Sequence, residues 1–203
     1  MALYNSLGQE ALDGVPLGSD LERSELQYSD GVALVAAYTA IASYEDGADV
    51  GPLWSAMLLL EKMTQHSASN PQLRLCLVRL HQLLGNVQRM FHHWQQLEVK
   101  QIQMDSISYI LCDHAARLGG LAQVASIYSQ TTAFFKEARA TGGEYVCQAY
   151  TYGNYGKVED IARLTQRLKN SMQWAWTRCE QAHWALLHKC RVRRPCCSFL
   201  LRF

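Results

Sequence analysis

One pattern occurs three times in the sequence: Leu84-Gly85-Asn86-Val87, Leu118-Gly119-Gly120-Leu121 and Tyr152-Gly153-Asn154-Tyr155. In each tetrapeptide an apolar or aromatic residue directly precedes a glycine, and another apolar or aromatic residue follows two positions after that glycine. Their glycines are spaced 34 residues apart, and Gly51 extends the series toward the N-terminus. Only glycine adopts cheaply the left-handed backbone that ends one helix before an antiparallel turn. The series therefore predicts helix–turn–helix units with turns at Gly51, Gly85, Gly119 and Gly153.

Apolar residues at fixed distances from these glycines support the same period. They include Leu77, Leu111 and Tyr145 eight positions before a glycine, and Met90, Val124 and Val158 five positions after it. A helical hairpin of 34 residues is the tetratricopeptide period. We therefore expect an all-α solenoid of antiparallel helical hairpins, a divergent tetratricopeptide-like array, over residues 28–188. An ordinary α-helical domain in which glycine happens to recur is the alternative.

The segments that flank this region differ from it in charge. Residues 1–27 are acidic and weakly periodic, so we expect an N-terminal segment with little structure. Residues 189–203 contain five bases, three cysteines and no acid, so we expect a disordered basic tail. Between Val158 and Leu186 the apolar residues follow a helical period without a break, which predicts one long amphipathic stretch.

Composition narrows the classes of function. The 203 residues carry a net charge of +1, so the chain has no global basic field for nucleic acid. No apolar run approaches the ~20 residues of a membrane span, and no secretory leader is evident at the N-terminus. Seven cysteines, an odd number without a Cys-x-x-Cys pair, favour free buried thiols over a disulfide framework. We expect a cytoplasmic protein without a membrane or a direct nucleic-acid partner.

The residues show no pattern of catalysis or cofactor binding. His92 and His93 are adjacent and would face different directions on a helix, and neither His-x-x-x-His nor Cys-x-x-Cys occurs. Glycine-rich phosphate loops and nucleophile-elbow motifs are also absent. Cys147 is a conceivable nucleophile, but its position in a predicted helix favours a packed, unreactive thiol. A cysteine-dependent enzyme is therefore the weakest hypothesis of function. We expect no catalytic, metal or cofactor-binding residues.

Aromatic residues gather late in the sequence. The candidates for a partner surface are Tyr150, Tyr155, Trp174, Trp176 and Trp184. Large aromatic side chains often anchor protein partners. A following repeat could equally bury these side chains. The sequence does not decide between a partner surface and a surface for the next repeat.

Several segments resemble one known family. Glu144–Ile161, Arg167–Ser171 and Leu59–Pro71 are similar to the auxiliary subunits of the NatB N-terminal acetyltransferase, as are Leu26–Asp30 and Leu83–Gly85. The similarity is collinear, covers about residues 4–188 and keeps the 34-residue register. The tail 189–203 matches nothing in that family.

The resemblance implies a function that composition and spacing do not. Such subunits are non-catalytic helical scaffolds that bind a catalytic subunit of the GNAT fold and tether it to the ribosome. The complex acetylates nascent chains that begin Met-Asp, Met-Glu, Met-Asn or Met-Gln, and acetyl-CoA belongs to the catalytic partner. The alternative is a generic tetratricopeptide adaptor that binds a peptide or a chaperone tail. Such an adaptor needs basic residues at repeated positions of its inner helices, and the sequence shows none at a fixed place.

The turn assignment makes a testable prediction. Gly119→Val should lower the free energy of unfolding by about 1–3 kcal/mol, because a β-branched residue is strained at positive φ. Chemical denaturation followed by circular dichroism measures the change. A variant that unfolds like the parent would show that Gly119 is not a turn residue.

Overall fold

The computed structural model describes residues 2–22 and 24–193, without the side chains of residues 2, 3, 113–116 and 187–193. Every regular element in this part of the chain is helical, which confirms the predicted all-α class. No helix among these residues has both the length and the apolarity to cross a membrane. The chain divides into two compact units. The first comprises residues 1–99 and 113–120, and the second comprises residues 100–112 and 121–203.

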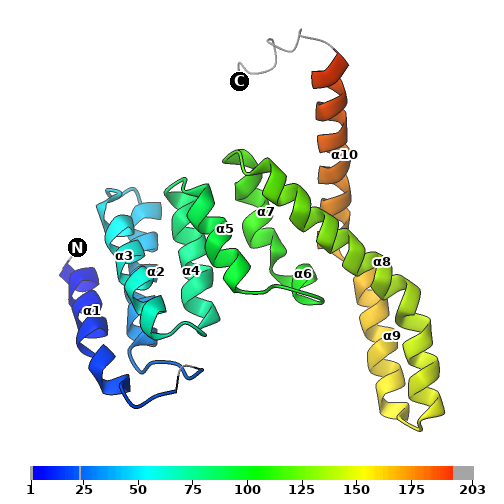
Figure 1. Cartoon of the computed structure of the whole chain (residues 1–203), viewed down its shortest axis with the longest axis horizontal. Helices are drawn as coiled ribbons and strands as arrows, with labels where there is room; N and C mark the ends of the chain where they lie inside the picture. Colours follow the sequence, from blue (N-terminus) through cyan, green and yellow to red (C-terminus); the bar gives the residue numbers. More distant parts are fainter. Residues whose placement is uncertain (1, 23, 194–203) are drawn as a thin grey trace. The chain divides into compact units, whose positions relative to one another are not determined.

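The first unit stacks its helices in chain order (Figure 1). They are α1 (Ala2–Asp13), α2 (Asp30–Glu45), α3 (Gly51–His66), α4 (Pro71–Leu83) and α5 (Val87–Gln96), with a short 3-10 helix at Val15–Gly18. Each helix turns one apolar stripe inward. On α3 the stripe is Leu53, Ala56, Leu60 and Met63, and on α4 it is Leu73, Leu77 and Leu80, all fully buried.

Asparagine side chains begin two of these helices. The Asn70 side chain accepts a hydrogen bond from the backbone N–H of Gln72 at 2.9 Å, and Pro71 occupies the first turn of α4. Asn86 accepts from the backbone N–H of Arg89 at 3.2 Å and caps α5. Such caps satisfy N–H groups that the helix itself cannot pair.

The prediction of weak structure for residues 1–27 is wrong for Ala2–Asp13, which forms α1. Tyr4 and Ala11, seven positions apart, are both buried and belong to the core that α2 and α3 complete. This pair places one face of α1 against its neighbours. The acidic character of the segment concealed that short apolar face.

The second unit contains α6 (Gln103–Ser106), α8 (Leu121–Thr151), α9 (Tyr155–Lys169), α10 (Met172–Arg193) and the first residues of α7 (Ser108–Arg117). Helices α8 and α9 lie side by side in opposite directions (Figure 1). The buried side chains of α8 include Val124, Tyr128 and Phe135. A buried polar chain joins α10 to this core, since Gln173 donates to Ser108 at 2.8 Å and Ser108 donates to the Met104 carbonyl.

Glycines with positive φ end several helices. Gly85, Gly119 and Gly153 have φ of +72°, +89° and +72°. After α4 the N–H of Asn86 bonds the carbonyl of His81, and after α8 the N–H of Asn154 bonds that of Ala149. These six-to-one bonds are the Schellman geometry that favours glycine.

The assignment of Gly51 to a turn is wrong. Gly51 is the first residue of α3, and the positive φ of +91° falls on Gly47. The N–H of Ala48 bonds the carbonyl of Ser43 and closes α2 at that point. Pro52, at the start of α3, already fixes a helical φ, so the chain reverses four residues before the position that the 34-residue spacing predicts.

Two helix boundaries also differ from expectation. The repeat pattern places two helices between Gly119 and Gly153, whereas α8 runs through this region as one helix of 31 residues. It contains no proline, and the helix continues through Gly142 and Gly143. Conversely, the stretch from Val158 to Leu186 breaks at Asn170, because the Ser171 hydroxyl accepts the backbone N–H of Trp174 at 3.1 Å and starts α10.

The predicted disorder of residues 189–203 is wrong for residues 189–193, which continue α10 to Arg193. Lys189-Cys190-Arg191-Val192-Arg193 holds no proline or glycine, and lysine and arginine are good helix formers, so nothing in it ends the helix. Residues 194–203 lie outside the described part of the chain.

Two adjacent glycines of α8 give a matched test of its packing against α9. A Cβ on Gly142 would lie 3.0 Å from Oγ1 of Thr165, whose hydroxyl is held by the Ile161 carbonyl. A Cβ on Gly143 would meet nothing within 4 Å. Gly143→Ala should therefore raise the free energy of unfolding by about 0.5–1 kcal/mol, as helix propensity dictates. Gly142→Ala should raise the free energy of unfolding by at least ~0.5 kcal/mol less than Gly143→Ala does, since its methyl group crowds Thr165. Urea denaturation compares the two, and equal stabilisation would contradict close packing of α8 on α9.

Candidate functional site

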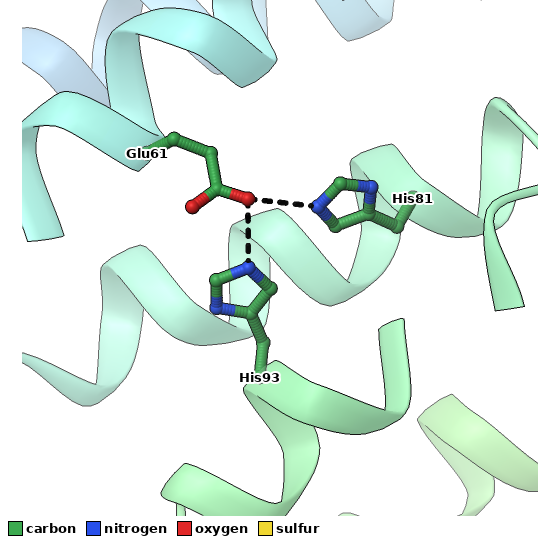
Figure 2. A group of neighbouring side chains, drawn as sticks. All are labelled: Glu61, His81 and His93. Carbon is green, nitrogen blue, oxygen red and sulfur yellow. Dashed lines mark hydrogen bonds and ion pairs between the residues drawn. The ribbon is translucent and has the colours of Figure 1, made fainter. Parts of the chain in front are cut away.

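A carboxylate and two histidines from three helices of the first unit meet at one point (Figure 2). Oε1 of Glu61 on α3 lies 3.3 Å from Nε2 of His81 on α4 and 3.0 Å from Nε2 of His93 on α5. The two imidazole rings are stacked, with centroids 5.4 Å apart. Both histidine side chains are buried, at 1% and 3% exposed, whereas that of Glu61 is 22% exposed.

The apolar stripes of α4 and α5 carry the histidines inward. His81 follows the buried Leu77 by four positions, and His93 follows the buried Met90 by three. Residues at these spacings share one face of a helix. An imidazole on such a face must find a partner, because an unpaired buried polar group is costly. Glu61 supplies that partner from the third helix.

Charge gathers at the same oxygen. Nη2 of Arg89 donates to Oε1 of Glu61 at 2.6 Å, so this atom accepts from three side chains. Burial raises the pKa of Glu61, but the hydrogen bonds from Arg89 and His93 outweigh it and bring the pKa to about 2. Burial lowers the pKa of His81 and of His93, and the hydrogen bonds to Glu61 offset only part of this effect. The cluster therefore holds a charged carboxylate with two neutral imidazoles near neutral pH.

The remaining ring nitrogens are buried too. Nδ1 of His81 and Nδ1 of His93 have no hydrogen-bond partner among the residues that the structure describes. The bonds to Glu61 therefore place the proton of each neutral ring on Nε2. Two imidazoles and a carboxylate are a donor set that divalent transition metals accept. Sequence spacing did not reveal this set, because its members lie on different helices and 12 to 32 positions apart.

The predicted aromatic residues fall in two separate places within the second unit. Tyr150 and Tyr155 contact each other across the Gly153 turn, with ring centroids 5.3 Å apart, and are 66% and 64% exposed. Trp174 instead packs on Phe135 of α8 and under the guanidinium of Arg139. Phe135 and Tyr150 are 15 residues apart on one helix, which is about 22 Å.

The other two tryptophans lie farther along α10. Trp176 is 45% exposed. Trp184 is half-buried, and its indole N–H is buried with no hydrogen-bond partner in the described part of the chain. Of the five candidates, the structure brings together only the tyrosine pair at the tip of the α8–α9 hairpin.

A groove that the sequence did not indicate lies beside this tip. It has a volume of about 630 Å³, and its lining includes Ile102, Phe134, Tyr145, Tyr152 and Leu164. Tyr145 is 53% exposed and Tyr152 is 79% exposed. Glu137 is the one charged residue among the described residues that line it. The groove therefore offers an apolar, aromatic surface with a weak negative charge.

The four cysteines whose side chains the structure describes fall into two classes. Cys76 and Cys112 are buried, and burial raises the pKa of each thiol to about 12, so both stay protonated. Cys147 and Cys179 are exposed, and the prediction that they pack in a core is wrong. Both lie on outer faces of long helices, where periodicity alone did not separate the two faces.

The Glu61 cluster predicts an unequal response to the loss of two glutamates. Glu61→Leu should lower the free energy of unfolding by about 2–4 kcal/mol, because two buried histidines lose a charged acceptor. Glu45 pairs with Arg79 at 3.1 Å on the surface, so Glu45→Leu should cost less than about 1 kcal/mol. Urea denaturation measures the free energy of unfolding of both variants, and a chelator in the solution keeps metal ions away from the cluster. Similar losses would show that the cluster does not hold the three helices together.

Comparison with known proteins identifies the family. The chain matches the model of the N-acetyltransferase B complex (NatB) non catalytic subunit over residues 1–194. It is 33% identical over 168 residues to the N-alpha-acetyltransferase 25, NatB auxiliary subunit, of Homo sapiens and of Rattus norvegicus, which covers 83% of this chain and 17% of each relative. It is 24% identical over 189 residues to the N-terminal acetyltransferase B complex subunit arm1 of Schizosaccharomyces pombe, covering 90% of this chain and 23% of that protein.

The chain thus spans about a sixth of the length of its mammalian relatives. The match runs through both compact units and includes every segment on which the resemblance rests. The relatives are auxiliary subunits, and the family is a non-catalytic one. The chain belongs to the family of non-catalytic subunits of the NatB N-terminal acetyltransferase complex.

Proposed function

We propose that this chain is a scaffold that binds the catalytic subunit of a NatB-type N-terminal acetyltransferase. The observation that carries the proposal is the match to the non-catalytic NatB subunits along residues 1–194. The catalytic subunit has the GNAT fold and binds acetyl-CoA. The complex acts in the cytoplasm at the ribosome, on nascent chains that begin Met-Asp, Met-Glu, Met-Asn or Met-Gln.

The helical architecture suits a scaffold. Glycine turns at Gly85, Gly119 and Gly153 recur every 34 residues, which supports a divergent tetratricopeptide-like array. The uninterrupted α8 fuses two helices of that array into one. Long helices joined by tight turns expose broad faces, as helical-repeat scaffolds do.

The groove beside the α8–α9 tip is the surface that we assign to the catalytic subunit. Tyr145, Tyr152 and Leu164 line it and are each more than two-fifths exposed. Exposed aromatic residues around an apolar depression are typical of the centre of a protein interface. Tyr150 and Tyr155 extend the same aromatic character beyond the rim.

The groove disfavours the alternative of a peptide-binding adaptor. An adaptor that grips a terminal carboxylate needs lysine or arginine in its binding surface. Among the described residues that line this groove there is no lysine or arginine, and the charged residue, Glu137, would repel a carboxylate.

Co-expression with a NatB catalytic subunit tests the proposal. The full chain should co-purify with the catalytic subunit, and Tyr145→Asp combined with Tyr152→Asp should weaken binding at least about tenfold. Tyr109→Asp is the control, because Tyr109 belongs to the same unit and is 58% exposed but does not line the groove.

The outcomes separate function from location. If the parent chain fails to bind the catalytic subunit, the proposed function of this chain is wrong. If the parent binds and the double variant binds equally well, the function stands but the groove is not the interface.

A further inference from the structure

We propose that Glu61, His81 and His93 form a binding site for a zinc ion. Three side chains of the ligand types that zinc prefers converge from α3, α4 and α5, and Figure 2 shows both Nε2 atoms directed at the same carboxylate oxygen. Imidazole nitrogen and carboxylate oxygen in a two-to-one ratio are an established zinc donor set in proteins. The site is independent of the scaffold function proposed above.

The spacing of the three atoms fits a tetrahedral ion. Zinc lies about 2.0–2.1 Å from nitrogen and oxygen ligands, so neighbouring ligand atoms of a tetrahedron are about 3.3 Å apart. The distances from Oε1 of Glu61 to the two Nε2 atoms are 3.3 and 3.0 Å. All three ligand atoms lie within 4.8 Å of one another. An ion between them requires only small shifts of side chains that the helices already hold in place.

Arg89 is the group that the ion must displace. Its guanidinium lies 2.6 Å from Oε1 of Glu61, where a zinc ion would sit against it. The Arg89 side chain is 45% exposed, so it can swing into solvent or move to the other carboxylate oxygen.

Exposure gives the ion a route and a fourth ligand. The two histidine side chains are almost wholly buried, whereas those of Glu61 and Arg89 are 22% and 45% exposed. Water that reaches Glu61 can therefore complete the tetrahedron. Zinc takes the place of the Nε2 protons, and each neutral ring then carries its proton on Nδ1. Neither Nδ1 atom has a partner within the described part of the chain. Missing support of this kind typically lowers metal affinity 10–100-fold, so we expect micromolar rather than tighter binding.

Titration of the full chain tests the site. The protein is freed of metal with a chelator, which is then removed, and zinc chloride alone is added in a calorimeter. We expect one zinc ion per chain, with a rise in the midpoint temperature of thermal unfolding. Cobalt(II) in its place should give the intense visible absorption of a tetrahedral ion. Absence of saturable zinc binding at micromolar concentration would overturn the proposal.

Variants locate the ion. Glu61→Gln and His93→Gln should each weaken zinc binding at least about a hundredfold, since each removes one of three protein ligands. The glutamine of Glu61→Gln keeps a carbonyl oxygen that accepts hydrogen bonds from the histidines. This variant therefore tests the site even if His93→Gln fails to fold. His66→Gln is the control, because His66 is an exposed histidine at the end of the helix that carries Glu61. Equal zinc affinity in Glu61→Gln and His66→Gln would place the ion elsewhere and overturn the proposal.

Arg89→Gln distinguishes a metal site from a purely structural network. Removal of the competing cation should raise zinc affinity about tenfold, although the metal-free protein loses an ion pair. The opposite result, a fall in zinc affinity to the level of Glu61→Gln, would contradict ligation through Oε1.

Discussion

Burial of one apolar stripe per helix is the constraint on which the first unit depends. Leucine, alanine and methionine side chains at helical spacing fill the space between α1 and α5, where a polar group is costly unless it is hydrogen-bonded. Two carboxylates supply most of the hydrogen bonds, although among the described residues Oδ1 of Asp30 and Nδ1 of both histidines stay unpaired. Asp30, at the start of α2, accepts from Ser67 at 2.6 Å and from Asn70 at 2.8 Å, and so ties α2 to the turn between α3 and α4. Glu61 does the same for α3, α4 and α5. Each carboxylate pairs polar groups from helices that the apolar stripes bring together.

Local signals in the sequence predicted much of the helical pattern and failed where a boundary depends on competing neighbours. Pro52, Pro71 and the glycines at 85, 119 and 153 act through their own backbone, so their effect could be seen without the fold. Gly51 follows the same spacing, but Pro52 beside it favours the start of a helix. Gly142 has no such local effect, since its role is to admit Thr165 of another helix. The start of α10 at Ser171 was missed, because the apolar period continues across it without a break.

The same distinction between local signals and tertiary packing applies to the candidate sites. Family membership was accessible because it rests on contiguous segments, and the comparisons confirm it. The Glu61 cluster was not accessible, because its three members share no spacing on one helix and only the packing of α3, α4 and α5 unites them. The aromatic residues were recognised by type, but Trp174 is covered by Phe135 and Arg139 while Tyr150 remains exposed. Residue type indicated what they could bind, and only the fold decided which were accessible.

The length of α8 also has a mechanical consequence. A helix of 31 residues is about 46 Å long, and its first half is packed by Val124, Tyr128 and Phe135 while its far end carries Tyr150. Because α9 packs along the second half, the α8–α9 hairpin would move as one arm whose fulcrum is the first half of α8. With about 22 Å between Phe135 and Tyr150, a tilt of roughly 5° at the fulcrum moves the aromatic tip by about 2 Å. If a ligand or protein shifted the first half of α8, the helix would transmit that movement to the aromatic tip.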